Sequence, residues 1–203
     1  MENQKSQKKV WENIAEEWHE FRQKPAQHTL KFLKDKKGKI LDLGSGSGRH
    51  LIPLKKAKFY LVDFSEKMIQ LAKQKANKKN INAEFFVSDL SSLPFEDNFF
   101  DYAIAISSIH CLETHEQRKK SIKEIFRVLK PGAEAEIALW NKASKRFKNS
   151  KKSKMIKWRD KGERFYYLFE PEEAYSLFKK TGFEITYKED PARMIVFIIK
   201  KPN

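Results

Sequence analysis

The stretch Lys39-Ile40-Leu41-Asp42-Leu43-Gly44-Ser45-Gly46-Ser47-Gly48-Arg49-His50 decides which fold the sequence predicts. An apolar run leads directly into three glycines at alternate positions, and a helical pattern begins at Arg49. Glycine tolerates the positive φ values of a tight turn, and it lets a ligand lie against bare backbone. We therefore expect a buried strand that ends in a ligand-binding turn, with the amides of that turn at the start of a helix.

Segments on both sides of this stretch alternate between strand and helix patterns. Alternation of this kind predicts an α/β fold whose mostly parallel sheet carries helices on both faces. After the first strand at 39–43, the predicted strands are 58–63, 83–87, 100–106, 133–140 and an antiparallel pair, 183–187 with 194–199. The predicted helices are 10–21, a segment opened by Pro25, a short helix at 49–54, one capped by Ser65, 114–129 and 171–180.

Length and composition exclude several classes of protein. The 203 residues suit one domain, expected to span 1–203 with N-terminal helices in 10–34 and a basic insertion at 141–161. A single cysteine, Cys111, excludes an internal disulfide or a cysteine-rich zinc site and fits a cytoplasmic compartment. The sequence shows no secretory signal and no apolar run of the ~20 residues that cross a bilayer. We expect no metal site, because no ligand spacing is shared by His19, His28, His50 and His115.

Positive charge is concentrated in the basic insertion. The chain has a net charge of +15, and residues 141–161 hold ten Lys or Arg against one acid, Asp160, for a local net of +9. Such charge favours a polyanionic partner, nucleic acid before a membrane surface, although a lysine-rich proteome or a solvated, mobile loop would also explain it. Apolar side chains suited to base stacking are interleaved with the charges: Phe147, Met155, Ile156 and Trp158.

Three aspartates narrow the choice of ligand for the glycine turn. A dinucleotide fingerprint would need a small residue in place of Arg49, and a phosphate-binding loop would need Gly-Lys-Ser/Thr, so neither fits. Asp42 precedes the first glycine, while Asp63 and Asp89 end the second and third predicted strands. These carboxylates suit an ammonium group, ribose hydroxyls and a purine amino group, respectively. Each aspartate alone is equally a cap or turn residue, but together they predict S-adenosylmethionine.

Four ordered motifs cover about residues 38–140: LDLGSGSGRH (41–50), FYLVDFSEKMIQLAK (59–73), SDLSSLPFEDNFFDYAIAISSIH (88–110) and IKEIFRVLKPG (122–132). They resemble the successive motifs of class I S-adenosylmethionine-dependent methyltransferases. The resemblance implies a Rossmann-like fold, with a seven-stranded sheet whose last strand is reversed. Ser45, often cysteine, and Ala133, often glycine, depart from the commoner pattern without threatening the cofactor site. The implied cofactor contacts are Asp42, Gly44, Gly46, Gly48, Asp63, Phe64, Asp89, Leu90 and Ile106.

Further segments narrow the choice of methyl acceptor. They are VWENIAEEWHEFRQKP (10–25), ISSIHCLETHEQRKKSI (106–122), ALWNKASKRF (138–147) and YYLFEPEEAYSLFKKTGFEI (166–185). They resemble the tRNA methyltransferases that esterify 5-carboxymethyluridine at the anticodon wobble position, and their archaeal relatives. Arg22, His110 and Tyr166 match residues of that subgroup. Ala26 and Cys111 depart from it, replacing a tryptophan and the second histidine of a His-His pair. The resemblance also suggests a small zinc-binding activator protein as a partner.

The implied reaction needs few catalytic groups. A carboxylate is already nucleophilic, so alignment and exclusion of water replace a strong base. We expect Arg22 to hold a carboxylate or phosphate bidentately and His110 to position the acceptor base. The alternatives are a surface helix-end arginine and a packed histidine. The residues expected to bind the anticodon stem-loop, with the lysine-rich amino terminus, are Lys145, Arg146, Lys151 and Lys152.

Two other functions stay open at this point. One is a small-molecule methyltransferase, because the fold and cofactor do not determine the acceptor. The other is a non-catalytic RNA-binding protein that retains the fold.

Overall fold

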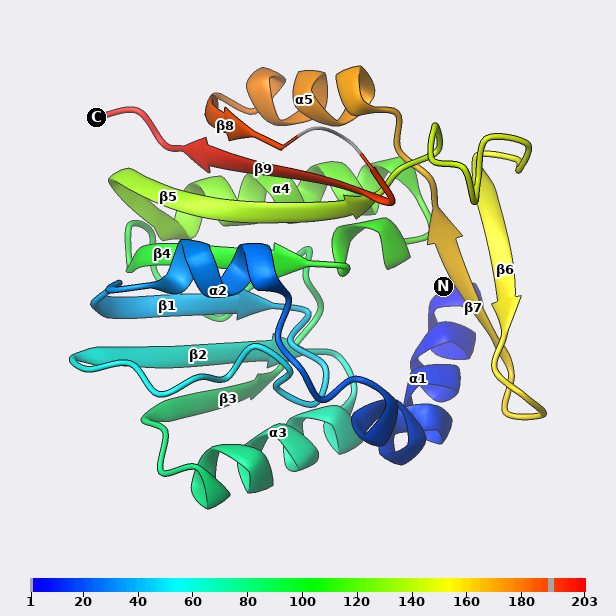
Figure 1. Cartoon of the computed structure of the whole chain (residues 1–203), viewed down its shortest axis with the longest axis horizontal. Coiled ribbons are helices and arrows are strands. Elements are labelled where there is room, and N and C mark those ends of the chain that lie inside the picture. Colours follow the sequence, from blue (N-terminus) through cyan, green and yellow to red (C-terminus); the bar gives the residue numbers. More distant parts are fainter. Residues whose placement is uncertain (1, 190–191) are drawn as a thin grey trace.

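A seven-stranded sheet forms the centre of the computed structural model, which describes residues 2–189 and 192–203, with side chains from residue 7 onward (Figure 1). The strand order is β3-β2-β1-β4-β5-β9-β8. Neighbours from β3 to β5 are parallel, whereas β9 is antiparallel to both β5 and β8. The predicted sheet with a reversed last strand is confirmed. Its strands are β1 (Gly38–Leu43), β2 (Ala57–Asp63), β3 (Ala83–Val87), β4 (Phe100–Ile106), β5 (Leu129–Trp140), β8 (Glu184–Lys188) and β9 (Met194–Lys200).

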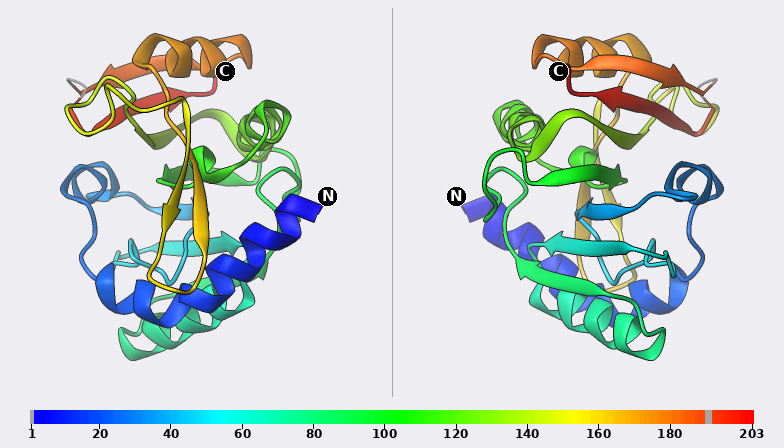
Figure 2. Two further views of the ribbon diagram at one scale, coloured as in Figure 1. Left: turned by 90° about the vertical axis from the view of Figure 1, so that its right-hand side faces the viewer. Right: turned by 90° about the vertical axis from the view of Figure 1, so that its left-hand side faces the viewer.

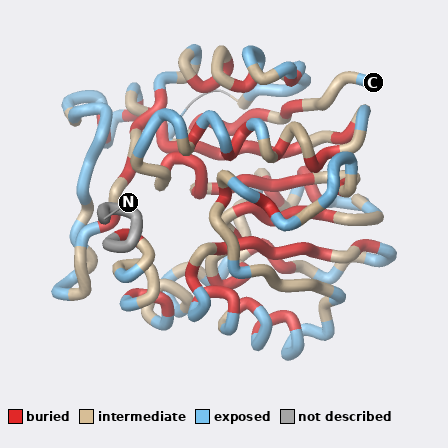
Figure 3. The backbone as a smooth tube through the Cα atoms, turned by 180° about the vertical axis from the view of Figure 1, so that it is seen from behind, coloured by how far each residue is buried: buried red, intermediate tan, exposed pale blue. Residues whose placement is uncertain are grey.

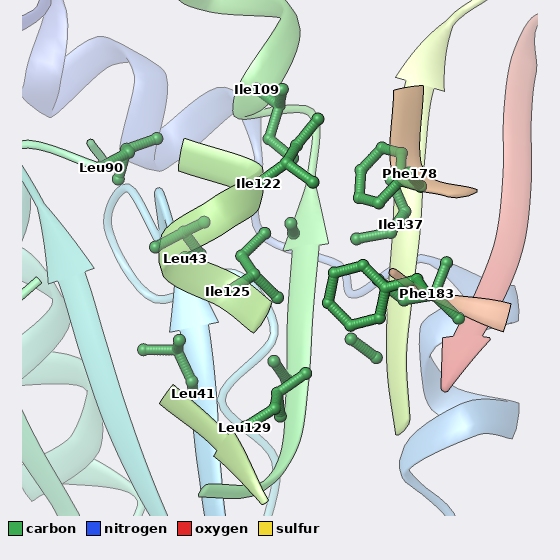
Figure 4. Close-up of a cluster of buried hydrophobic side chains, with 14 of the residues drawn as sticks. Leu41, Leu43, Leu90, Ile109, Ile122, Ile125, Leu129, Ile137, Phe178 and Phe183 are labelled. Carbon is green, nitrogen blue, oxygen red and sulfur yellow. The ribbon is translucent and has the colours of Figure 1, made fainter. Parts of the chain in front are cut away.

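Two apolar cores lie on opposite faces of this sheet. Side chains alternate along β1, so Leu41 and Leu43 join one core and Ile40 joins the other. α4 and α5 cover the first core through side chains such as Ile122 and Phe178 (Figure 4), and α2 and α3 cover the second. Helices therefore lie on both faces, as predicted. The helices are α1 (Glu2–Phe21), α2 (Gln27–Leu33), α3 (Glu66–Lys78), α4 (His115–Val128) and α5 (Pro171–Lys180).

Capping residues determine where the helices begin. The Ser65 side chain accepts a hydrogen bond from the Met68 N–H at the start of α3, which confirms the predicted cap. Thr114 forms a capping box at the start of α4. A side-chain cap of this kind contributes ~1 kcal/mol to helix stability. α2 begins later than predicted, because Ala26 rather than Pro25 is the extended residue that precedes its first turn.

α1 and a separate hairpin lie across the carboxyl ends of the central strands (Figure 2). The hairpin consists of β6 (Ser153–Lys157) and β7 (Glu163–Tyr167). The Gln7 side chain on α1 donates to the Glu163 carbonyl at 3.0 Å and accepts the Phe165 N–H at 2.9 Å. The Trp158 indole donates to Glu17 Oε2 at 2.7 Å. We call α1 and the β6–β7 hairpin together the lid.

The prediction of a helix at 49–54 is wrong. Residues 48–50 form turns and 51–54 have no regular structure. Pro53 has no N–H to donate, and only five residues separate Arg49 from the turn that precedes β2, so a helix would gain almost no hydrogen bonds here. The amides of the glycine turn therefore do not lie at a helix N-terminus.

The basic insertion is more ordered than a solvated loop. Phe147 and Ser144 are buried, and residues 153–157 pair with β7. Figure 3 shows that the buried backbone, in red, is concentrated in the central sheet. β5 also begins earlier than predicted, because Leu129 already pairs with Phe100 before the Pro131-Gly132 sequence. Within 2–189 and 192–203, no helix combines the length and apolar character needed to span a membrane.

Candidate active site at the carboxyl edge of the sheet

A cavity of about 280 Å³ lies where the glycine turn faces the lid. Side chains of the lid, Trp11, Trp18 and Tyr166, line it opposite the turn. The cavity brings most of the predicted cofactor contacts together with both predicted acceptor residues. The predicted residues that line it are Arg22, Gly44, Gly46, Asp63, Phe64, Asp89, Leu90, Ile106, His110 and Tyr166. Those that do not are Asp42, Gly48, Lys145, Arg146, Lys151 and Lys152.

The three glycines of the turn have different environments. Gly44 has φ +70°, and a Cβ there would lie 2.3 Å from the Ser108 Cβ, so no side chain fits. Gly46 has φ +51° and opens toward Met68, whose sulfur would lie 3.9 Å from an added Cβ. Gly48 is instead packed against Leu51 and α3, away from the cavity. Two glycines thus present bare backbone to the cavity, and the third packs the turn against the helix.

Asp63 is held by the turn that it faces. Its Oδ2 accepts the Gly46 N–H at 2.9 Å, and its Oδ1 accepts the Ser65 N–H at 3.0 Å. Burial raises the pKa of Asp63 to about 6, although these backbone hydrogen bonds oppose the shift. A carboxylate can accept about four hydrogen bonds, so Asp63 retains capacity for a ribose hydroxyl. Asp89 at the end of β3 is oriented similarly, by the Ser91 N–H at 2.7 Å.

Asp42 lies beneath the turn with 1% of its surface exposed. Burial, with the nearby Asp63 charge, raises the pKa of Asp42 to about 8, while Lys75 opposes the shift. Its Oδ2 has no hydrogen-bond partner among the described residues. A buried acid in this state gains most from a cation brought close to it. The bare backbone, the oriented Asp63 and this acid fit S-adenosylmethionine, which carries an ammonium group and a ribose.

His110 is fixed as a hydrogen-bond donor. It lies in a short 3₁₀ turn after β4 (Ile109–Cys111) and is fully buried. Its Nδ1 accepts the Trp140 N–H at 3.0 Å, so the neutral ring carries its proton on Nε2. Burial lowers the pKa of His110 to about 3, and Nε2 has no partner among the described residues. At neutral pH His110 therefore offers one N–H and no basic nitrogen.

Tyr166 and Arg22 are the other residues predicted to contact the acceptor, and both line the cavity. Tyr166 on β7 stacks on Trp140 with ring centroids 4.1 Å apart. Its hydroxyl oxygen accepts a hydrogen bond from Arg164 Nη1 at 2.6 Å, which leaves the hydroxyl proton to donate elsewhere. Burial raises the pKa of Tyr166, so the hydroxyl stays protonated. Arg22, just beyond α1, lies over the rings of Trp18 and Phe21.

The predicted RNA-binding residues lie outside the cavity, on the basic insertion. Lys145 and Lys151 are exposed, and Arg146 lies over the rings of Trp140 and Phe147. Lys152 forms an ion pair with Glu173 at 2.9 Å, so part of its charge is already compensated. Of the amino-terminal lysines, Lys8 pairs with Glu66 and the side chain of Lys5 lies outside the described residues.

Sequence reasoning missed three arginines near the cavity. Arg49 and Arg193 line it, and Arg164 positions Tyr166 from within the lid. No spacing in the sequence links these residues, because they come from the glycine turn, the segment before β9 and the hairpin. Only the folded chain brings them together.

Comparison with known proteins agrees with this geometry. Residues 40–132 match the protein family described as a methyltransferase domain. That range begins in β1, contains the glycine turn and the three strand-end aspartates, and ends after α4. Residues 40–132 thus form a methyltransferase domain of the class I S-adenosylmethionine-dependent kind. S-adenosylmethionine is therefore the cofactor of this methyltransferase.

Relatives of this methyltransferase include tRNA-modifying proteins. It is 30% identical over 151 residues to the Mus musculus protein named "Probable tRNA methyltransferase 9B", covering 73% of this chain and 32% of that protein. It is 37% identical over 101 residues to the Arabidopsis thaliana tRNA (carboxymethyluridine(34)-5-O)-methyltransferase, covering 50% of this chain and 24% of that protein. The chain thus spans a third or less of the length of these relatives.

Solved structures share the fold over nearly the whole methyltransferase. A Pyrococcus horikoshii OT3 protein superposes with a TM-score of 0.71 at 28% identity, covering 87% of this chain and 89% of that one. A chain from the complex between the Haloferax volcanii Trm112 methyltransferase activator and its methyltransferase superposes with a TM-score of 0.71 at 17% identity. That match covers 94% of each chain and shows likeness of fold alone.

Proposed function

We propose that this methyltransferase acts on tRNA and esterifies the carboxylate of a 5-carboxymethyluridine-type base at the wobble position. The observation that carries the proposal is that three hydrogen-bond donors lie together at the acceptor end of the cavity. His110 Nε2–H, the Tyr166 hydroxyl and the Arg22 guanidinium are the donors. Such a set matches a carboxylate, which accepts several hydrogen bonds and pairs with a guanidinium.

His110 and Cys111 cannot serve as the base for an acceptor that must lose a proton. A hydroxyl, a carbon acid or a protonated ring nitrogen needs a general base whose pKa lies near the working pH. His110 cannot accept a proton at neutral pH, and burial raises the pKa of the Cys111 thiol to about 12. A carboxylate acceptor needs no such base, because it is already ionised.

The residues of the site then have distinct tasks in the transfer. S-adenosylmethionine, when bound against the glycine turn, supplies a methyl group on a sulfonium sulfur. Asp63 and the backbone of Gly44 and Gly46 orient the cofactor, and His110, Tyr166 and Arg22 orient the acceptor oxygen. Trp140 and the lid cover the acceptor end and exclude water. Alignment of this kind is the main source of rate in a displacement without proton transfer.

The choice of tRNA rests on two further observations. The named activity of the Arabidopsis thaliana relative is on carboxymethyluridine of tRNA. The basic insertion carries a net charge of +9 and lies beside the acceptor end, with Arg146 stacked next to Trp140. We propose that Lys145, Arg146 and Lys151 bind the phosphates of the anticodon stem-loop in the cytoplasm, with a smaller part for Lys152.

The test is to incubate the protein with tRNA and methyl-labelled S-adenosylmethionine, then digest the RNA to nucleosides for mass spectrometry. We expect label on a carboxymethyluridine, and we expect mild alkali to release it, because esters hydrolyse there and N- or C-methyl groups do not. Label that survives alkali would exclude the carboxylate. Turnover only with small molecules would move the assignment to a small-molecule methyltransferase.

We also propose a small activator protein as a partner. β3 is an edge strand of the main sheet, and its Val87 is 47% exposed. An exposed apolar edge strand is suited to cover by a second protein. The Haloferax volcanii neighbour of the same fold was solved with an activator. Co-purification from the native source tests this partner, and a Val87→Lys variant should lose it while a Tyr187→Lys variant on β8 should not.

A further inference from the structure

More positive charge faces the cavity than one carboxylate needs. Arg22, Arg49 and Arg193 all line it, from three segments distant in the sequence. None of them forms an ion pair with a described acidic side chain. One guanidinium already pairs bidentately with a carboxylate. The remaining arginines therefore lack a counter-charge in the protein.

The arginines also repel one another. Burial, with the charges of Arg193, Arg164 and Arg146, lowers the pKa of Arg22. Burial and the charge of Arg22 lower the pKa of Arg49. Like charges gathered without acids are unfavourable unless an anion binds among them. The cofactor and the proposed acceptor each bring one carboxylate, so three guanidinium groups leave one positive charge for a further anion.

Backbone contacts hold the two unassigned arginines at the cavity. Arg49 Nε donates to the Lys24 carbonyl at 2.6 Å, which leaves both terminal NH₂ groups available. Asn141 anchors the backbone that carries Arg193. The Asn141 side chain donates to the Ala192 carbonyl at 2.8 Å, and the Asn141 backbone N–H donates to the Arg193 carbonyl at 3.2 Å. The exposed Arg193 side chain extends from this anchored segment at the rim of the cavity.

We propose that Arg49 and Arg193 form, beside Arg22, a binding site for a phosphodiester group of the RNA strand next to the acceptor nucleoside. The proposal rests on the proposed function, since it needs the acceptor to be part of an RNA chain. Each phosphodiester of an RNA strand carries one negative charge. When a nucleotide enters the cavity, the phosphodiester next to it lies at the rim of the cavity. A guanidinium fork matches its two free oxygens.

The test measures binding to a synthetic anticodon stem-loop that carries 5-carboxymethyluridine at the wobble position. A second stem-loop has uncharged methylphosphonate linkages on both sides of that nucleotide. We expect Arg193→Gln to weaken binding of the natural stem-loop ~10-fold and to lower the salt dependence by about one ion. With the methylphosphonate stem-loop the same substitution should change affinity less than ~2-fold, because the phosphate charge is already absent.

Matched variants separate charge from structure. Arg49→Lys retains the charge but loses the contact to the Lys24 carbonyl, whereas Arg49→Gln loses both. The control is Arg159→Gln, since Arg159 is exposed on the lid and pairs with Glu17 instead of facing the cavity. It should weaken binding of both stem-loops equally. Affinity for S-adenosylmethionine, measured by calorimetry, shows that each variant keeps its cofactor site.

The outcomes distinguish this inference from the proposed function. If the protein methylates the stem-loop but Arg193→Gln weakens binding of both RNAs equally, the phosphodiester site is excluded and the tRNA function stands. If the protein neither binds nor methylates the stem-loop, both fail. If Arg49→Gln and Arg193→Gln each lose affinity only for the natural RNA, the site is established.

Discussion

The cofactor half and the acceptor half of the cavity are built in different ways. The cofactor half consists of strand ends and the turns that follow β1, β2 and β3, so its residues follow one another in the sequence. The acceptor half joins the end of α1, the turn after β4, the end of β5, the hairpin and the segment before β9. A site made of consecutive turns is recognisable from a motif, whereas a site assembled from distant segments is not. The predictions below test whether the two halves are also separable in function.

The largest expected effect is in the cofactor half, from Gly44→Ala. The new Cβ would lie 2.3 Å from Ser108 at a positive φ, so the turn must move. A displacement of this size should weaken S-adenosylmethionine binding ~100-fold. Gly132→Ala is the matched control, because Gly132 also has a positive φ of +75° but lies outside the cavity, where its Cβ would meet only the Asn203 side chain. Equal calorimetric affinities for the two variants would show that the Ser108 contact is unimportant.

His110→Ala tests the acceptor half. Loss of the only N–H that His110 offers should lower kcat ~100-fold and leave cofactor affinity unchanged. The removed ring also leaves the Trp140 N–H without its acceptor, so His110→Asn, which restores an acceptor, should recover part of the rate. The wild-type rate should not change between pH 5 and 8 through His110, because its pKa is about 3. A rate that rises with a pKa near 6.5 would contradict the donor role.

Asp42→Asn should change affinity and stability in opposite directions. Loss of the carboxylate should weaken cofactor binding ~10-fold, because the charge beneath the turn then no longer attracts the ammonium group. The folded-state pKa of Asp42, about 8, is above its ordinary value of 3.8. The folded chain therefore binds the proton more tightly, and the free energy of unfolding falls as pH rises from 4 to 8.

The variant lacks that pH dependence. Without cofactor, Asp42→Asn should be more stable than the wild type at pH 8 by roughly 5 kcal/mol, with the two converging near pH 4. Denaturant unfolding at both pH values measures the difference. An equally steep fall in the stability of the variant would assign the titration to another group, with Asp63 the first candidate.

The smallest effect should come from the lid. Glu17 accepts the Trp158 indole N–H and pairs with Arg159 and Lys161, so Glu17→Gln loosens the hairpin from α1 without touching the cavity. We expect KM for tRNA to rise ~3-fold while cofactor affinity stays the same. A fall in cofactor affinity would show that the two halves are coupled through the lid.

The residues themselves explain which predictions from sequence hold. Period-two burial and a Gly-rich turn are local properties, so the sheet, the Ser65 cap and the strand-end aspartates follow from the sequence alone. The helix at 49–54 failed because one proline and a short connection outweigh an apolar pattern. The tautomer of His110 depends on a backbone N–H thirty residues away, and the packing of the basic insertion depends on α1. Neither is visible in a linear pattern.

The contact between Gln7 and β7 joins residues 156 and 158 positions apart in the chain. Closing so long a loop carries a large entropic penalty, so the lid docks only after the sheet that supports it has formed. The lid contributes no strand to the main sheet, so it can open without breaking the pairing of that sheet. Amide hydrogens of α1 and the hairpin should therefore exchange with solvent well before those of β1 and β4. Access to the acceptor site is thus governed by the part of the chain that folds last.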